Sequence, residues 1–190
     1  MSNGPLDSAR DGAVVDTLRS LLDGRVAAYE IYLTREKGMS VEAKEGSIDS
    51  MKVRSSAGVG LRLLSGMRQG FGFSSVLSSD ALSDLVDKAI TGASRSAEDR
   101  FLGFADPVAS CAAVEDLGIF DEAFAGANEK EKIDTAVEIE KSALSYDKRV
   151  KRVRKASYSE SIAASRIVNS NGVDLTEAAT YYSASVTAVA

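Results

Sequence analysis

Apolar and polar residues in the first half of the chain change from a helical period to a strand-like period. Apolar residues first recur at the three- and four-residue spacing of a helix, at Val14, Leu18, Leu21 and Leu22. Beyond Gly24 they alternate with polar residues, and short turns divide this stretch at Lys37-Gly38, Glu45-Gly46-Ser47 and Ser65-Gly66. The pattern predicts one helix and then strands linked by hairpins, and therefore an antiparallel sheet with one covered face.

The last alternating stretch is Gly70-Phe71-Gly72-Phe73. It lacks the strand-then-helix context and the following lysine of a phosphate-binding loop, so a strand is expected. Its glycines would let another backbone pack closely against it. A second helix is predicted after the N-cap candidates Ser78 and Ser79, with apolar residues on one side at Leu82, Leu85, Val86, Ala89 and Ile90.

The second half of the chain again places strands after a helix. Residues 94–126 show weak periodicity, so an irregular connection with short helical turns is expected there. Asn128 and Glu131 resemble a capping box at the start of a third helix. Asn171-Gly172 favours a type I′ hairpin turn. Strands are predicted at residues 149–161, 162–169, 173–178 and 181–190.

The two halves share a short motif. Arg54–Val59 and Val168–Val173 both contain Ser-x-Gly-Val, which predicts an internal duplication of residues 11–95 and 128–190, with coincidence as the alternative. The expected organisation is an unstructured leader over residues 1–10 and an α+β domain over residues 11–190. In that domain, helices pack on an antiparallel or mixed sheet. The apolar strand at Tyr181–Ala190 suggests a segment cut from a longer protein.

Composition limits the chemistry available to this chain. It contains no histidine, so neither a two-histidine zinc site nor a Ser-His-Asp or Cys-His arrangement can be built from it. Its 23 basic and 28 acidic residues give a net charge of −5, which argues against broad binding to nucleic acid. The single Cys111 excludes an intrachain disulfide and is expected to be an incidental thiol. Neither a membrane-spanning run nor a signal peptide is recognised, so a cytoplasmic location is expected.

The strongest charge cluster begins the strand predicted at 149–161. It comprises Lys148, Arg149, Lys151, Arg152, Arg154 and Lys155. A solvated strand surface is the favoured interpretation, contact with a partner protein or peptide is the second, and phosphate binding is the third, because aromatic residues do not interleave with the cations. The carboxylates of Glu42, Glu45 and Asp49 are likewise expected to be solvated rather than catalytic or metal-binding.

Five residues are the candidates for a partner or peptide surface. Tyr181 and Tyr182 would place one ring on each face of a strand, and tyrosine is enriched at interfaces. The candidates are Lys151, Arg152, Arg154, Lys155 and Tyr182.

Several motifs together resemble the N-terminal domain of the TldD/PmbA family. They are Gly38–Gly46, Ser56–Arg62, Arg68–Ser75, Leu77–Leu82, Asp147–Val150 and Asn169–Val173. Each motif is loose, but their order and spacing are specific, and the likeness runs from about Leu18 to Ala190. The chain is more similar to PmbA, also called TldE, than to TldD.

The resemblance implies a part of a larger enzyme. Family members are bacterial and archaeal proteins more than twice this length, described as modulators of DNA gyrase and as maturation factors for a microcin. TldD and TldE form a heterodimeric metallopeptidase, in which TldD carries zinc on a His-Glu-x-x-x-His helix beyond the N-terminal domain. No position here matches that motif, so no catalytic or metal-binding residue is carried over. Zinc would belong to a partner subunit or to a C-terminal domain absent from this chain.

The expected function follows from that resemblance. It is a non-catalytic N-terminal domain that contributes to the substrate cleft and partner interface of a TldD/TldE-type metallopeptidase, in peptide maturation and proteolysis. The implied partners are a TldD-like subunit or a second copy, with peptide or unfolded polypeptide as substrate. The alternative is a regulator associated with DNA gyrase or nucleic acid, which would use the cluster at 148–155.

Overall fold

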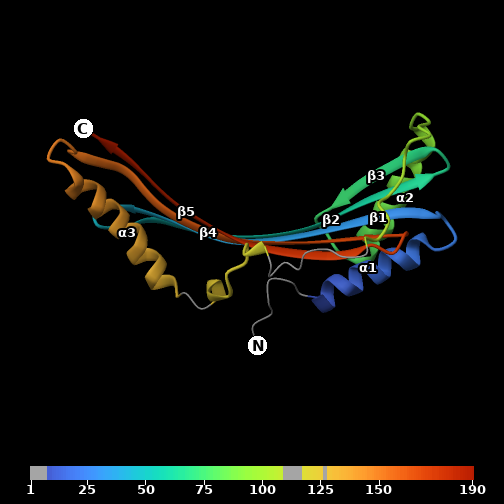
Figure 1. The fold of residues 1–190 in the computed structure, drawn as a ribbon, viewed down its shortest axis with the longest axis horizontal. Coiled ribbons are helices and arrows are strands. Elements are labelled where there is room, and N and C mark those ends of the chain that lie inside the picture. The colour runs from blue at the N-terminus through green and yellow to red at the C-terminus, as the bar shows by residue number, and fades with distance from the viewer. Residues whose placement is uncertain (1–7, 109–116, 126–127) are drawn as a thin grey trace. The chain divides into compact units, whose positions relative to one another are not determined.

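The computed structural model describes residues 8–108, 117–125 and 128–190 (Figure 1). Its elements, in chain order, are α1 (Ser8–Leu22), β1 (Ala28–Lys44), β2 (Ser47–Ser65), β3 (Arg68–Ser74), α2 (Ser79–Arg95), η2 (Glu122–Ala125), α3 (Glu129–Tyr146), β4 (Arg152–Asn169) and β5 (Asp174–Val189). The described strands form one five-stranded antiparallel sheet in the order β3-β2-β1-β4-β5. The predicted α+β class is therefore confirmed. No helix among these residues is long and apolar enough to cross a membrane.

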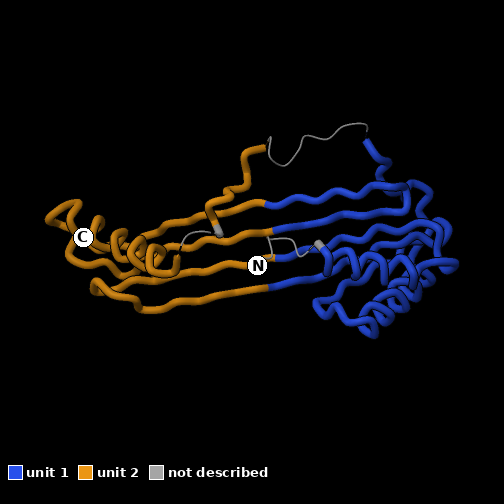
Figure 2. The backbone as a smooth tube through the Cα atoms, turned by 90° about the horizontal axis from the view of Figure 1, so that it is seen from below, with its two compact units in different colours: residues 1–35, 56–116, 164–178 blue, residues 36–55, 117–163, 179–190 orange. Residues whose placement is uncertain are grey.

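The chain divides into two compact units, which Figure 2 distinguishes by colour. Unit 1 comprises Met1–Arg35, Ser56–Asp116 and Ala164–Ala178. Unit 2 comprises Glu36–Ser55, Leu117–Ala163 and Ala179–Ala190. Each of β1, β2, β4 and β5 therefore contributes a segment to both units. The predicted duplication of residues 11–95 and 128–190 stays a prediction.

The strands are longer than the sequence pattern predicted. The turn expected at Lys37-Gly38 is wrong, because β1 continues through it. A Cβ atom on Gly38 would lie 2.9 Å from Cβ of Ser161. This glycine therefore serves close approach within the sheet rather than chain reversal. The strand breaks predicted at 161–162 and 179–180 are also wrong, because β4 and β5 continue through these positions.

Of two predicted hairpin turns, the one at Glu45-Gly46-Ser47 is confirmed and the one at Asn171-Gly172 differs from the prediction in type. Glu45 and Gly46, between β1 and β2, have φ values of 55° and 74°, as a type I′ turn requires. In the loop between β4 and β5 only Gly172 has positive φ, at 98°, so the type I′ turn predicted at Asn171-Gly172 is wrong. This loop is longer than a two-residue turn, and the side chain of Asn169 stabilises it. Its Oδ1 atom accepts from the backbone N–H groups of Asn171 and Val173 at 3.0 and 3.1 Å.

The core of unit 1 lies between helices α1 and α2 and strands β1 and β2. Its largest fully buried side chains are Val15, Leu18, Leu22, Ile31, Val59, Leu61, Leu63, Leu82, Val86 and Val168. Helix α2 also packs against β3 at two glycines. A Cβ atom on Gly70 would overlap the carbonyl oxygen of Ala89, and one on Gly72 would lie 2.7 Å from Cδ1 of Leu85. The close backbone packing expected at these glycines is confirmed.

Unit 2 has a smaller core and a polar anchor. Val41, Ala43 and Ala136 are buried, and partly buried apolar side chains surround them. The carboxylate of Glu140, on α3, is 3% exposed and accepts from the backbone N–H groups of Glu45 and Gly46 at 2.8 and 2.9 Å. Because one buried carboxylate satisfies both turn amides, it fixes the β1–β2 hairpin to α3.

The predicted helix starts are confirmed. Ser78 is the N-cap of α2, and its hydroxyl accepts from the backbone of Ala81 at 3.4 Å. Asn128 is the N-cap of α3, with Oδ1 accepting from the backbone of Glu131 at 2.9 Å. The reciprocal bond differs from a standard capping box, because the Glu131 carboxylate accepts from the side-chain amide of Asn128 rather than from its backbone.

The connection predicted at 94–126 begins two residues too early, because Ser94 and Arg95 still belong to α2. Its other described residues are irregular apart from the short helix η2. Glu98 forms an isolated antiparallel bridge with Arg68. The side-chain amides of Asn169 and Asn171 donate to the carbonyls of Ala105 and Phe104, respectively. Of the predicted leader, residues 1–7 lie outside the described residues and Ser8–Arg10 belong to α1. Cys111 also lies outside the described residues.

The glycine contact between α2 and β3 predicts a sharp asymmetry between two Gly→Ala substitutions. Gly70→Ala should lower the free energy of unfolding by about 1–3 kcal/mol, because the new methyl group meets backbone that cannot move aside. Gly92→Ala, in α2 with open space around it, should raise stability by about 0.5–1 kcal/mol. Urea unfolding followed by circular dichroism measures both values. Equal effects of the two variants would contradict the packing described.

The anchor at Glu140 predicts a second asymmetry. Glu140→Gln should destabilise the chain by about 2 kcal/mol, because the two turn N–H groups donate to different carboxylate oxygens, and the amide replaces one of these oxygens with an NH2 group that cannot accept. The isosteric change Glu138→Gln, at an exposed position of the same helix, should alter stability by less than about 0.5 kcal/mol. Thermal unfolding at low protein concentration compares them, and an unaffected Glu140→Gln variant would refute the anchoring role.

Candidate functional site

The predicted basic cluster does not form one continuous cationic surface. The guanidinium of Arg149 donates to both carboxylate oxygens of Asp147, at 3.0 and 3.1 Å. Nζ of Lys155 lies 2.7 Å from Oε1 of Glu42. These hydrogen bonds hold the pKa values of the Asp147 and Glu42 carboxyls below their usual range. Two of the predicted cations are therefore already paired with carboxylates.

The remaining predicted residues lie at the start of β4. The backbone N–H of Lys151 donates to the carbonyl of Val189 at 2.9 Å, so Lys151 and Arg152 lie beside the end of β5. Arg154 and Lys155 are both exposed between the buried residues Val153 and Ala156. Both side chains are therefore open to solvent.

Arg154 and Lys155 line a small cavity of about 380 Å³. Its other lining residues are Glu42, Ala43, Lys44, Asp49 and Thr187. The sequence predicted a solvated carboxylate at Glu42, whereas the structure places it in an ion pair with Lys155. Cations and carboxylates both line the cavity, so it lacks the single-sign charge that a phosphate-binding surface requires.

Tyr182 is placed away from these cations, in a polar network near the start of α3. Its hydroxyl donates to Asp121 at 2.8 Å, and its ring centroid lies 6.1 Å from that of Phe124. Partial burial and the Asp121 hydrogen bond raise its pKa to about 12. Tyr182 therefore helps to hold η2 against β5.

The same network continues into the interior of unit 2. Nζ of Lys132 lies 2.5 Å from Oε1 of the buried Glu160, and the hydroxyl of Tyr158 donates to Oε2 at 3.0 Å. Burial, together with this hydrogen bond, raises the pKa of Tyr158 to about 12. The carboxylate is fully engaged by its two partners, so the network serves to position α3 on β4.

A groove beside α3 was not predicted from the sequence. It has a volume of about 920 Å³, with apolar lining from Ile139, Ala143, Tyr146, Val150, Val186 and Ala188 and polar lining from Asp134, Thr135, Glu138 and Ser142. It runs between α3 and the edge strand β5. The sequence contained one sign of this groove, which was the absence of charged residues over 178–190. A strand buried inside a sheet would show the same pattern, so the sign did not distinguish the two.

A second unpredicted feature lies in unit 1, and we call it the aromatic surface. Phe71 and Phe73, on β3, are 61% and 80% exposed. With Tyr32 and the backbones of Gly58 and Gly60 they line a cavity of about 390 Å³. The two phenylalanines are exposed because the glycines that alternate with them face α2.

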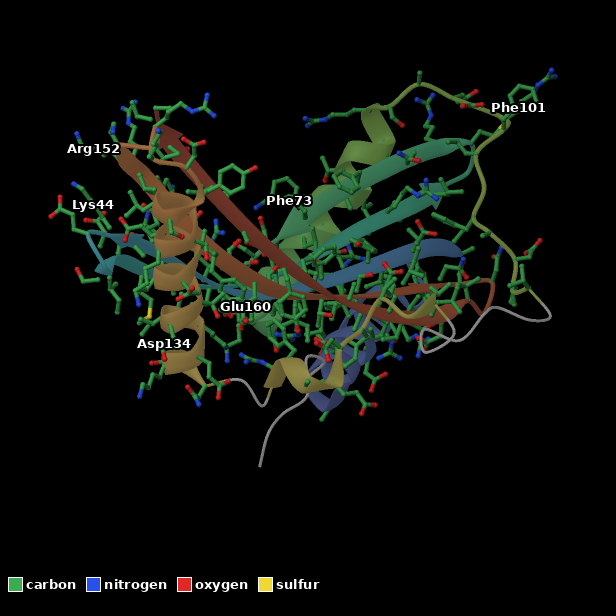
Figure 3. All side chains as sticks on the ribbon, turned by 60° about the vertical axis from the view of Figure 1, so that its left-hand side comes forward. Lys44, Phe73, Phe101, Asp134, Arg152 and Glu160 are labelled. Carbon is green, nitrogen blue, oxygen red and sulfur yellow. The ribbon has the colours of Figure 1, made fainter. Side chains whose placement is uncertain are left out.

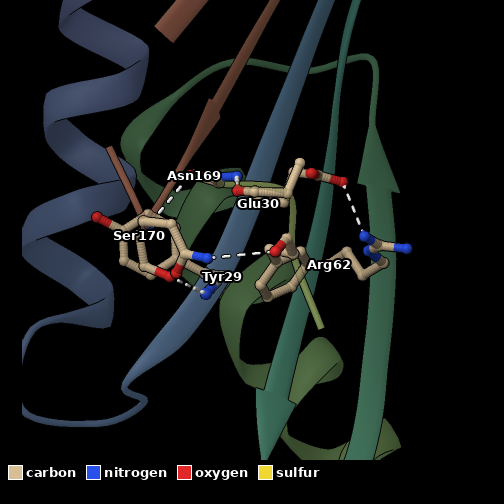
Figure 4. A network of polar contacts seen from close by, with 8 residues as sticks. Tyr29, Glu30, Arg62, Asn169 and Ser170 are labelled. Atoms are coloured by element: carbon tan, nitrogen blue, oxygen red, sulfur yellow. Dashed lines mark hydrogen bonds and ion pairs between the residues drawn. The ribbon is translucent and has the colours of Figure 1, made fainter. Parts of the chain in front are cut away.

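An ion pair borders the aromatic surface. Arg62 lies 3.2 Å from Oε1 of Glu30, and its guanidinium stacks 4.7 Å from the ring centroid of Phe104. Figure 4 shows Glu30 between Arg62 and the junction where Tyr29 meets Ser170. There the backbone of Ser170 donates to the carbonyl of Tyr29 at 2.9 Å, and its hydroxyl accepts from the backbone N–H of Tyr29 at 3.2 Å. The result is an apolar surface with a polar border, in which the buried Nε of Arg62 has no hydrogen-bond partner among the described residues.

The donor set does not fit the zinc ion that the family resemblance implies elsewhere. The chain has no histidine, and no group of three Cys, Asp or Glu side chains is suited to hold a metal ion among residues 8–108, 117–125 and 128–190. No reaction step is therefore assigned to a metal in this chain.

Comparisons with known proteins agree on one family. Residues 29–93 match the PmbA/TldA metallopeptidase domain 1, and residues 122–190 match the PmbA/TldA metallopeptidase central domain. The chain is 26% identical over 159 residues to the metalloprotease PmbA of Escherichia coli O157:H7, covering 84% of this chain and 35% of that protein. It is 24% identical over 147 residues to a PmbA homologue of Haemophilus influenzae, covering 77% and 32%. The chain thus spans about a third of the length of these curated relatives.

Solved structures share the fold. A Bacteroides thetaiotaomicron protein named as a candidate modulator of DNA gyrase has a TM-score of 0.80 at 24% identity, covering 94% of this chain and 40% of that one. TldE from Thermococcus kodakarensis has a TM-score of 0.70 at 15% identity, covering 93% and 39%. With two family domains matched over most of its residues, the chain belongs to the PmbA/TldD family of metallopeptidases.

Proposed function

We propose that this chain is a non-catalytic part of a PmbA/TldE-like protein, which supplies substrate-contacting and partner-contacting surfaces to a two-subunit metallopeptidase. The aromatic surface of unit 1 is the observation that carries the substrate role. Its exposed phenylalanines and bare glycine backbones can receive apolar side chains of an unfolded polypeptide. The names of relatives, a metalloprotease and a TldE, support the peptidase setting.

The remaining parts of the proposal follow from the same setting. The zinc and the hydrolytic residues would belong to a TldD-like subunit or to the part of the relatives that this chain does not span. Peptide maturation and proteolysis would be the cellular role, and the cytoplasm the location. A nucleic-acid role has weaker support, because Glu42 and Asp147 pair with two of the cations that such a role would use.

The substrate role predicts polypeptide binding that depends on the aromatic surface. Fluorescein-labelled β-casein, an unfolded polypeptide, should bind the chain, and Phe71→Ser with Phe73→Ser should weaken the affinity at least about tenfold, because apolar contact area is lost. The matched control is Phe101→Ser, which changes an equally exposed phenylalanine outside the cavity and should leave the affinity unchanged. Fluorescence anisotropy measures all three proteins.

The non-catalytic role is tested on the same samples. With zinc added, the chain alone should release no casein fragments above the background of buffer. Chelator-sensitive hydrolysis by the chain would contradict the assignment. Equal casein affinities for the Phe71/Phe73 variant and the Phe101 variant would contradict the substrate surface.

A further inference from the structure

The sheet face that carries the aromatic surface already holds one aromatic side chain of this chain. Phe104 is partly buried, and the guanidinium carbon of Arg62 lies 4.7 Å from the centroid of its ring. The segment around Phe104 has no regular secondary structure. The side-chain amides of Asn171 and Asn169 hold it by the carbonyls of Phe104 and Ala105, at 3.2 and 2.9 Å. Backbone hydrogen bonds together with a seated side chain are how surfaces bind polypeptides.

A second position for a ring lies one step along β2. Residues two apart in a strand face the same side, so Gly60 shares the face of Arg62. The antiparallel register pairs Gly60 with Phe73 and Arg62 with Phe71. A Cβ atom on Gly60 would lie 3.8 Å from Cε2 of Phe71 and 3.9 Å from the carbonyl oxygen of Tyr32, both at ordinary contact distance. The backbone of Gly60 is therefore a bare floor between aromatic residues of β1 and β3.

The shape of the cavity favours a planar group. Its volume of about 390 Å³ is near the lower end for ligand pockets, which suits a single side chain. Aromatic rings gain from offset or edge-to-face contact with other rings, beyond the area that they bury, and an aliphatic side chain lacks this gain. The chain's own exposed Phe101 is not among the lining residues, and Figure 3 shows it well apart from Phe73.

The charge of the lining favours a neutral group. Among the lining residues only Arg62 and Glu30 are charged, and they form an ion pair at 3.2 Å (Figure 4). A cation would be attracted to the ring faces but repelled by Arg62, and an anion would meet Glu30 beside that arginine. The other polar lining, from Thr34, Ser74 and Ser75, carries hydroxyl groups without charge. The cavity therefore complements an uncharged ring.

We propose that the aromatic surface is a socket for one aromatic side chain of a bound polypeptide, seated on the backbone of Gly60 between Tyr32, Phe71 and Phe73. The missing side chain at Gly60 makes this position specific for a ring. The inference rests on the proposed function for the polypeptide, and it deepens that function by naming the side chain that is selected.

NMR titration of the isotope-labelled chain with unlabelled peptides tests the socket. The peptides are short glycine–serine sequences with one central phenylalanine, leucine or lysine. The phenylalanine peptide should bind with a dissociation constant at least about threefold lower than either of the others, because only its ring gains ring contacts. Its addition should shift the amide signals of Gly58 and Gly60, which line the cavity.

Three variants separate the socket from general apolar binding. Gly60→Val fills the floor with a residue that suits a strand, and it should abolish the preference for phenylalanine. The matched control is Ser56→Val, at an exposed position on the same face of β2 outside the lining, and it should keep the preference. Phe73→Leu, at a position that is 80% exposed, keeps an apolar side chain without the ring and should reduce the preference while leucine binding persists.

The results distinguish the inference from the proposed function. Binding of the leucine or lysine peptide as tight as that of the phenylalanine peptide would overturn the socket. Equal effects of Gly60→Val and Ser56→Val, or no shift at Gly58 and Gly60 with any peptide, would also overturn it. Casein binding that depends on Phe71 and Phe73 without a preference for the ring refutes the socket alone. A ring preference in a chain that does not bind casein refutes the substrate role alone.

Discussion

The hydrogen-bonding requirement of the strand backbone is the constraint on which this structure depends. Every non-proline residue carries a donor and an acceptor, and burying either without a partner is costly. Four strands of 16 to 19 residues satisfy this requirement by pairing along most of their length. The hairpin turns satisfy it at the ends, where Glu140 and Asn169 accept from turn amides.

The helices meet this sheet by different means in the two units. In unit 1, α1 and α2 bury a broad set of aliphatic side chains, and glycines on β3 let α2 approach the strand backbone. In unit 2, few apolar residues are buried, and polar contacts of α3 through Glu140, Lys132 and Glu160 do more of the positioning. An element held by a few directed contacts can leave an apolar groove open at its side, as α3 does.

The sequence was sufficient for local features and insufficient for long-range ones. Helix starts at Ser78 and Asn128 were predicted because a capping side chain acts within a few residues. The turn at Gly38 was predicted wrongly, because a glycine that admits a neighbouring strand looks the same in sequence as one that reverses the chain. The Asn171-Gly172 turn failed because the side chain of Asn169 selects a different loop.

Candidate site residues show the same limit. The cations at 148–155 were found, but the pairing of Lys155 with Glu42 joins residues 113 positions apart and leaves no sequence signal. The groove depends on where α3 lies, which its periodicity does not specify. Amide hydrogen exchange measured by NMR tests the central claim, that buried side chains satisfy the backbone groups of the hairpin turns, most directly. The account predicts that the N–H groups of Glu45 and Gly46 exchange slowly in the original chain and faster in the Glu140→Gln variant. Rapid exchange at both amides in the original chain would contradict it.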